Sequence, residues 1–63
     1  MTFYVQIETG NDAMLDGRDI ADALRVVASK VSGIGNIDRH GEDTGNRIGD
    51  LNGNKVGEWG ISE

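Results

Sequence analysis

The sequence predicts a single α+β domain with the element order β-α-β-β, in which one helix packs on a three-stranded, mainly antiparallel sheet. Three observations predict this fold class. Apolar and polar residues alternate in Thr2–Thr9, apolar residues recur at helical spacing within Asp12–Ser32, and Asn46–Ile61 contains an Asn-Gly turn. With 63 residues, the chain is expected to form one domain, residues 1–63, around a small core.

The first strand is predicted for Thr2–Thr9 because aromatic and β-branched residues alternate there with polar residues. The side chains expected on the core face are Phe3, Val5 and Ile7. The side chains expected on the opposite face are Tyr4, Gln6 and Glu8. The turn-forming run Gly10-Asn11-Asp12 should end the strand.

The helix is predicted to begin after Asp16, whose carboxylate can cap the first turn, with Asp19 completing a capping box. An earlier start at Asn11 or Asp12 is the alternative. Four residues form the apolar stripe expected to face the sheet: Ile20, Leu24, Val27 and Val31. Ala23 and Ala28 flank this stripe, and Gly33 is expected to be the C′ residue that ends the helix. The following segment, Gly35–Gly45, is predicted to be a loop.

The hairpin is predicted from Asn52-Gly53, since a type I′ turn needs a positive φ at both of its central residues. This turn sets Asp50 opposite Lys55, Arg47 opposite Glu58 and Ile48 opposite Gly57, which gives two pairs of opposite charge. One face of the hairpin would then carry Ile48, Trp59 and Ile61. The other face would carry Arg47, Leu51, Val56 and Glu58.

The helix lies between the first two strands, so these strands should run parallel and the crossover should be right-handed. We therefore favour the strand order 1-3-2, in which every neighbouring pair is antiparallel. The order 3-2-1 is the alternative. The residues expected in the core are Phe3, Val5, Ile7, Ile20, Leu24, Val27, Val31, Ile48, Trp59 and Ile61.

Two stretches could bind a metal ion. Asp50-x-Asn52-x-Asn54 has the oxygen spacing of a calcium loop, but Lys55 and Ile61 stand where such a loop needs Gly and Glu. His40 lies near Asp38, Glu42 and Asp43, a set that could hold zinc or transfer protons, although a single His without Cys is a poor zinc set. We therefore favour a turn and a solvated polar loop, and we predict no metal or cofactor site, no catalytic residues and no enzymatic activity.

Composition narrows the classes of partner. The net charge of −5, from eleven acidic and six basic residues, argues against direct binding to nucleic acid. The sequence contains no Cys, no apolar run long enough for a membrane span and no signal segment, so we expect a cytoplasmic protein. A core this small often gains stability when the protein forms oligomers, and we expect a homo-oligomer.

The opening strand FYVQIET, the GNDAM segment, the single helix and above all the closing segment GNRIGDLNGNKVGEWGI resemble small accessory proteins of tailed phages. This resemblance covers most of the chain. It implies a phage product that acts in the host cytoplasm on a host protein, on a host defence system or on itself as an oligomer, and it implies no catalytic residues.

The function expected is therefore a small protein-interaction module that engages a host or defence factor, as an oligomer. The alternatives are an oligomeric sponge for a small ligand such as a nucleotide, which needs convergent basic residues, and an acidic mimic of nucleic acid. For a sponge, the basic residues near glycine-rich backbone are Arg39, Arg47 and Lys55. The residues expected to bind a partner are Tyr4, Leu51, Val56, Arg47, Glu58 and Val26. Of these, Val26 lies off the helical stripe beside Asp19 and Asp22, where a stray exposed valine is the alternative explanation.

Overall fold

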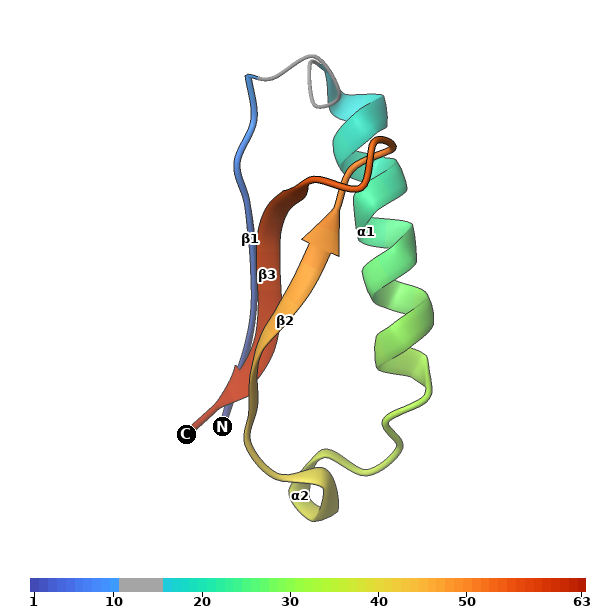
Figure 1. Ribbon diagram of the computed structural model, residues 1–63. Coiled ribbons are helices and arrows are strands. Elements are labelled where there is room, and N and C mark those ends of the chain that lie inside the picture. The colour runs from blue at the N-terminus through green and yellow to red at the C-terminus, as the bar shows by residue number, and fades with distance from the viewer. Residues whose placement is uncertain (11–15) are drawn as a thin grey trace.

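The protein has the predicted α+β fold, seen in a computed structural model that describes residues 1–10 and 16–63. The elements follow one another as β1 (Thr2–Ile7), α1 (Gly17–Ser32), α2 (Ile37–His40), β2 (Asp43–Gly49) and β3 (Lys55–Ser62). The strand order is β1-β3-β2 and both neighbouring pairs are antiparallel, which confirms the favoured order over its alternative. Figure 1 shows α1 running along one face of this sheet, nearest to β2.

The predicted capping box forms at the start of α1. The side chain of Asp16 accepts hydrogen bonds from the backbone N–H groups of Arg18 and Asp19, and the side chain of Asp19 accepts one from the N–H of Asp16. The alternative start, at Asn11 or Asp12, lies outside the described residues. Among the described residues, no helix is long and apolar enough to cross a bilayer.

The segment expected to be a loop, Gly35–Gly45, is partly regular instead. Asn36 caps α2 by accepting a hydrogen bond from the N–H of Arg39, and Gly41 closes this short helix with a φ of 79°. Strand β2 then starts at Asp43, still within the expected loop. The end of α1 also differs from expectation, because Gly33 keeps a right-handed φ of −85° and the first positive φ after the helix is at Gly35.

The turn between β2 and β3 is not type I′. Gly53 has the expected positive φ of 82°, but Asn52 does not, since only glycines have positive φ among the described residues. The N–H of Gly53 donates to Asp50 O, and the N–H of Asp50 donates to Asn54 O, so the loop has three residues. Asp50 Oδ1 also accepts from the N–H groups of Asn52 and Asn54, at 2.8 and 2.9 Å. These bonds favour a type I turn followed by a left-handed glycine.

A β-bulge beside this turn corrects the predicted register. Arg47 faces Glu58 and Ile48 faces Gly57, as predicted, but Gly49 then faces Lys55. The predicted pair of Asp50 with Lys55 therefore does not form. The residue skipped by the pairing is Val56, which is buried in the core rather than placed on the open face of the sheet. The bulge interrupts the strict alternation of side chains on which the prediction rested.

The core lies between α1 and the strands β2 and β3. Its buried side chains are Ala23, Val27, Ile48, Val56, Trp59 and Ile61. Phe3 and Leu24, both predicted to be buried, are 48% and 42% exposed. The remaining predicted core residues are only partly buried: Val5, Ile7, Ile20 and Val31. The centre of the helical stripe is thus Ala23 and Val27, whose small side chains let α1 approach β2 closely and leave β1 less covered.

Candidate protein-binding surface

An apolar seam runs between α1 and β1 on the helix-covered face of the sheet. We define it by Phe3, Val5, Ile7 and Leu24. It exists because α1 lies nearest to β2, at the far side of the sheet from β1 (Figure 1). Its strand residues carry apolar side chains on the covered face, and Phe3 reaches Trp59 with ring centroids 6.1 Å apart. The seam therefore joins the core to an exposed apolar surface.

Leu24 belongs to the β1 side of α1 because of the helical angle between residues. Val26 lines a groove with Gly49 and Leu51, so it faces the hairpin end of β2. Successive helical residues are 100° apart, so Leu24 and Val26 lie on opposite sides of the buried Ala23. Leu24 therefore points away from β2, toward the part of the sheet that α1 leaves open.

The opposite, helix-free face of the sheet carries Tyr4, Arg47 and Glu58, but without the apolar centre expected there. Val56 is buried in the core, and Leu51 is at the tip of the turn with 92% of its surface exposed. The predicted grouping of Tyr4, Leu51 and Val56 is therefore wrong, because the bulge moves Val56 to the core and the longer loop carries Leu51 off the sheet.

Tyr4 has a structural role on this face. It stands opposite Gly60 on β3, and its hydroxyl accepts a hydrogen bond from the N–H of Gly45 on β2, at 3.2 Å. The same hydroxyl donates to Glu58 Oε2 at 3.3 Å. A Cβ at Gly60 would lie 2.8 Å from the Tyr4 oxygen. Tyr4 thus spans all three strands, and it covers a glycine that has no side chain of its own.

The two remaining partner candidates, Val26 and Leu51, line the same groove of about 160 Å³ between α1 and the hairpin turn. Val26 is 54% exposed. The other groove residues include Ala23, Asp19, Asp22 and Asp50, so the groove combines three apolar side chains with three carboxylates. Val26 is therefore exposed, as expected, but it shares its surroundings with Leu51.

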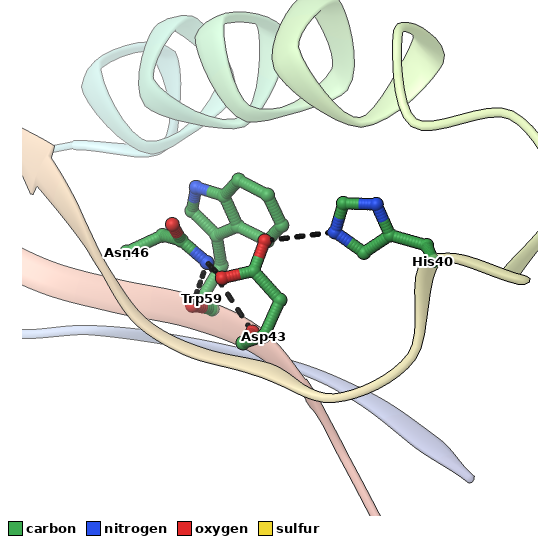
Figure 2. Close-up of polar contacts among 4 residues, drawn as sticks. All are labelled: His40, Asp43, Asn46 and Trp59. Carbon is green, nitrogen blue, oxygen red and sulfur yellow. Dashed lines mark hydrogen bonds and ion pairs between the residues drawn. The ribbon is translucent and has the colours of Figure 1, made fainter.

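His40, Asp43 and Asn46 form a chain of polar contacts beside Trp59, on the helix-covered face (Figure 2). His40 Nε2 lies 2.9 Å from Asp43 Oδ2, and Asn46 Nδ2 donates to Asp43 Oδ1 at 3.2 Å. Asn46 Nδ2 also lies within hydrogen-bond distance of the backbone oxygens of Asp43 and Trp59. These contacts tie α2 to β2 and bridge a second register shift, between Asp43 and Asn46.

This polar chain has the geometry of a structural clasp. The side chains of His40 and Asp43 are each about one-third exposed. Within the described residues, no group of three or more His, Asp or Glu side chains could hold a metal ion. Two other residues were expected near His40, namely Asp38 and Glu42. Neither takes part in this chain of polar contacts, and both are exposed. The absence of a metal site nevertheless remains a prediction.

The clasp formed by His40, Asp43 and Asn46 should make the free energy of unfolding depend on pH in the acidic range. The contacts with His40 and Asn46 hold the pKa of Asp43 below its ordinary value of 3.8. A carboxyl group whose pKa is lowered by folding stabilises the folded state above the unfolded pKa, and this contribution is lost as the pH falls through the folded pKa. When the pH is lowered from about 5 to about 2, the free energy of unfolding should fall less for Asp43→Asn than for the wild type. Urea unfolding at the two pH values would measure this.

Glu42→Gln is the matched control, because it removes one carboxylate from the neighbouring exposed position. Its free energy of unfolding should fall as much as that of the wild type between the two pH values. An Asp43→Asn variant with the full wild-type acid sensitivity would show that the clasp does not contribute to it.

The basic residues expected for an anion site do not come together on one element. Arg39 lies in α2, whereas Arg47 lies in β2 and Lys55 at the start of β3. Figure 1 shows α2 and the β2–β3 turn at opposite ends of the molecule. A guanidinium N–H of Arg47 is bound to Gly53 O, within its own hairpin. Of these three residues, Arg39 therefore lies apart from Arg47 and Lys55.

Sequence reasoning missed the apolar seam, although the sequence contained a signal for it. The apolar positions of the helix extend from Val26 through Ala23 and Val27 to Leu24 and Ala28, an arc wider than one narrow sheet can cover.

Comparison with known proteins finds no matching family model, no matching curated protein and no matching solved structure.

Proposed function

We propose that this protein is a small protein-interaction module and that its binding surface is the apolar seam. The observation that supports this proposal is the exposure of Phe3 and Leu24, near the half-buried Val5 and Ile7. Strand alternation and the helical angle assign both exposed side chains to the β1 side of the helix-covered face. Interfaces are enriched in aromatic side chains at their centre, and a few such residues carry most of the binding energy. Phe3, which also contacts Trp59, is the natural anchor.

The size of the domain supports the same proposal. A chain of 63 residues buries a smaller fraction of its surface than larger domains do. Covering Phe3 and Leu24 would remove further apolar surface from water, at about 25 cal/mol for each Å². The resemblance to phage accessory proteins implies a host protein as the partner, with the assembly formed in the host cytoplasm.

The test compares two substitutions on opposite sides of α1. Leu24→Glu places a charge in the seam, whereas Val26→Glu places the same charge in the groove beside the hairpin. Proteins retained by the immobilised wild type from a bacterial lysate would be identified and purified. Their binding to each variant would then be measured by calorimetry.

We expect Leu24→Glu to weaken binding of the purified partner at least tenfold, because a tenfold change requires the loss of only about 1.4 kcal/mol. Val26→Glu should change the affinity by no more than about twofold. Both substitutions affect exposed positions, so circular dichroism should show both variants folded. Equal affinities for the two variants would place the binding surface elsewhere. If only Val26→Glu binds weakly, the partner uses the groove of Val26 and Leu51 and the seam proposal is wrong.

A further inference from the structure

We infer that the free edge of β1 pairs with β1 of a second copy, giving a two-fold symmetric dimer with one continuous six-stranded antiparallel sheet. The inference goes beyond the proposed function, since it names a second copy of this chain as the neighbour of β1. Among the described residues, the strand order β1-β3-β2 leaves one side of β1 without a neighbouring strand.

The backbone groups at this edge belong to the residues of the seam. The N–H of Glu8 donates to Val56 O at 2.7 Å, in line with the register in which Ile7 faces Gly57. Along an antiparallel strand, successive residues direct their N–H and C=O groups to alternate sides. The even-numbered residues of β1 therefore bond to β3. Phe3, Val5 and Ile7 direct their N–H and C=O groups to the free edge.

The free edge of β1 lacks the features that keep strands from pairing. Thr2–Ile7 contains no charged residue and no proline, and its register with β3 is regular throughout. Edge strands usually carry charges, prolines or bulges that prevent edge-to-edge association. The other edge strand, β2, has these protections: Asp43 and Arg47 are charged, and register shifts occur near both of its ends.

The sequence of β1 is complementary to itself about Val5. In an antiparallel pair centred there, Val5 faces Val5, and Phe3 faces Ile7 of the second copy. These are the residues whose backbone groups are free, so three residue pairs can each exchange two hydrogen bonds. On the other face, Tyr4 would lie opposite Gln6, and Thr2 opposite Glu8. No two like charges face each other, although each copy carries a net charge of −5.

The dimer would enlarge the seam rather than close it. Antiparallel pairing keeps both helices on the same face of the joined sheet, and each α1 lies nearest to its own β2 (Figure 1). The two β1 strands would then form the middle of the sheet, with a helix on either side. The floor between the helices would contain two copies of Phe3, Val5 and Ile7.

The first experiment measures mass and removes one edge hydrogen-bond donor. Sedimentation equilibrium of the purified wild type should give twice the chain mass of 6.7 kDa at micromolar concentration. A synthetic chain with an N-methyl group on Val5 loses an edge donor while its side chain is unchanged. Its dimer should be at least tenfold weaker. N-methylation at Leu51, in the hairpin turn, is the control and should leave the dimer unchanged. A wild type that stays monomeric would overturn the inference.

The second experiment tests the register, using the fact that the chain has no cysteine. Val5→Cys should form a disulfide between copies on oxidation, because paired strands bring opposite Cα atoms to within about 5.5 Å. Phe3→Cys and Ile7→Cys should not, since four residues of strand, roughly 13 Å, separate each from its equivalent. A dimer that cross-links best at another position would overturn the Val5-centred pairing.

The two proposals can fail separately. A monomeric wild type whose partner binding is still lost in Leu24→Glu would leave the seam proposal standing without the dimer. If Val5→Cys cross-links the dimer but Leu24→Glu leaves the affinity for the partner unchanged, the dimer would be supported and the seam proposal would be wrong.

Discussion

Gly57→Ala is expected to lower the free energy of unfolding by more than about 3 kcal/mol, close to the whole stability of a domain of this size. A Cβ at Gly57 would lie 1.9 Å from Gln6 O and 2.9 Å from Ile7 Cα. Both atoms belong to the backbone of β1, so no side-chain rotation can relieve the contact. The strands β1 and β3 would have to separate where β1 ends, at the pair of Ile7 with Gly57.

Gly49→Ala provides the matched control in β2. A Cβ there would meet the Arg47 guanidinium at 3.1 Å, and this flexible side chain can move away. We expect a loss below about 1 kcal/mol, as for ordinary surface substitutions. Urea unfolding followed by circular dichroism would measure both variants. Equal midpoints would show that β1 does not approach Gly57 this closely.

Trp59→Ala is expected to cost about 3–5 kcal/mol, the range for removing a buried aromatic side chain. Trp59 is 4% exposed and belongs to the buried cluster with Val27, Ile48 and Val56. Its ring also contacts Phe3, which would lose this neighbour. Circular dichroism is again the appropriate measurement, because the substitution removes the only tryptophan and its fluorescence.

Trp59→Phe should be far milder, at about 1 kcal/mol, for a reason specific to this site. The Trp59 Nε1 group is buried and has no hydrogen-bond partner among the described residues. An unpaired buried donor costs about 1–3 kcal/mol, so its removal offsets part of the lost apolar contact. If Trp59→Phe proved as harmful as Trp59→Ala, the Nε1 group would have to be bonded in solution.

Local signals in the sequence predicted β1, α1, the hairpin of β2 and β3 and most of the sheet, but not α2. The capping box of Asp16 and Asp19 needs only residues three apart. The pairing of Arg47 with Glu58 followed from the position of the Asn52-Gly53 turn and was supported by their opposite charges. The strand order followed from the antiparallel hairpin and the helical crossover. All of these inferences depend on short-range geometry, for which the side chains themselves are informative.

The turn was harder to predict, because Asn-Gly fits two geometries. A type I′ turn needs positive φ at both residues, whereas the observed loop needs it only at Gly53. The oxygen of Asp50 selects the second geometry by binding two N–H groups of the turn. The bulge that follows then reverses the placement of Val56. Because the turn was misassigned, Val56 was missing from the predicted core and was predicted instead on the open face of the sheet.

The candidate site was missed because it depends on where the helix lies across the sheet. Leu24 and Ala23 both fit an apolar stripe, and the sequence alone does not say which is central. Packing of α1 nearest to β2 buries Ala23 and exposes Leu24 together with Phe3. The short helix α2 did have a local signal, namely Asn36 as a cap and Gly41 as a stop.

The central position of β3 also constrains the order in which the protein can fold. Of the three strands, β3 is the last in the chain, yet both others pair only with it. During synthesis β1 emerges first and has no strand to join until β3 has followed. The hairpin of β2 and β3 can close early because its residues are near in sequence, whereas even the shortest connection from β1, between Ile7 and Gly57, encloses α1, α2 and β2. Closing so long a loop slows folding, and we expect β1 to dock last, in the rate-limiting step.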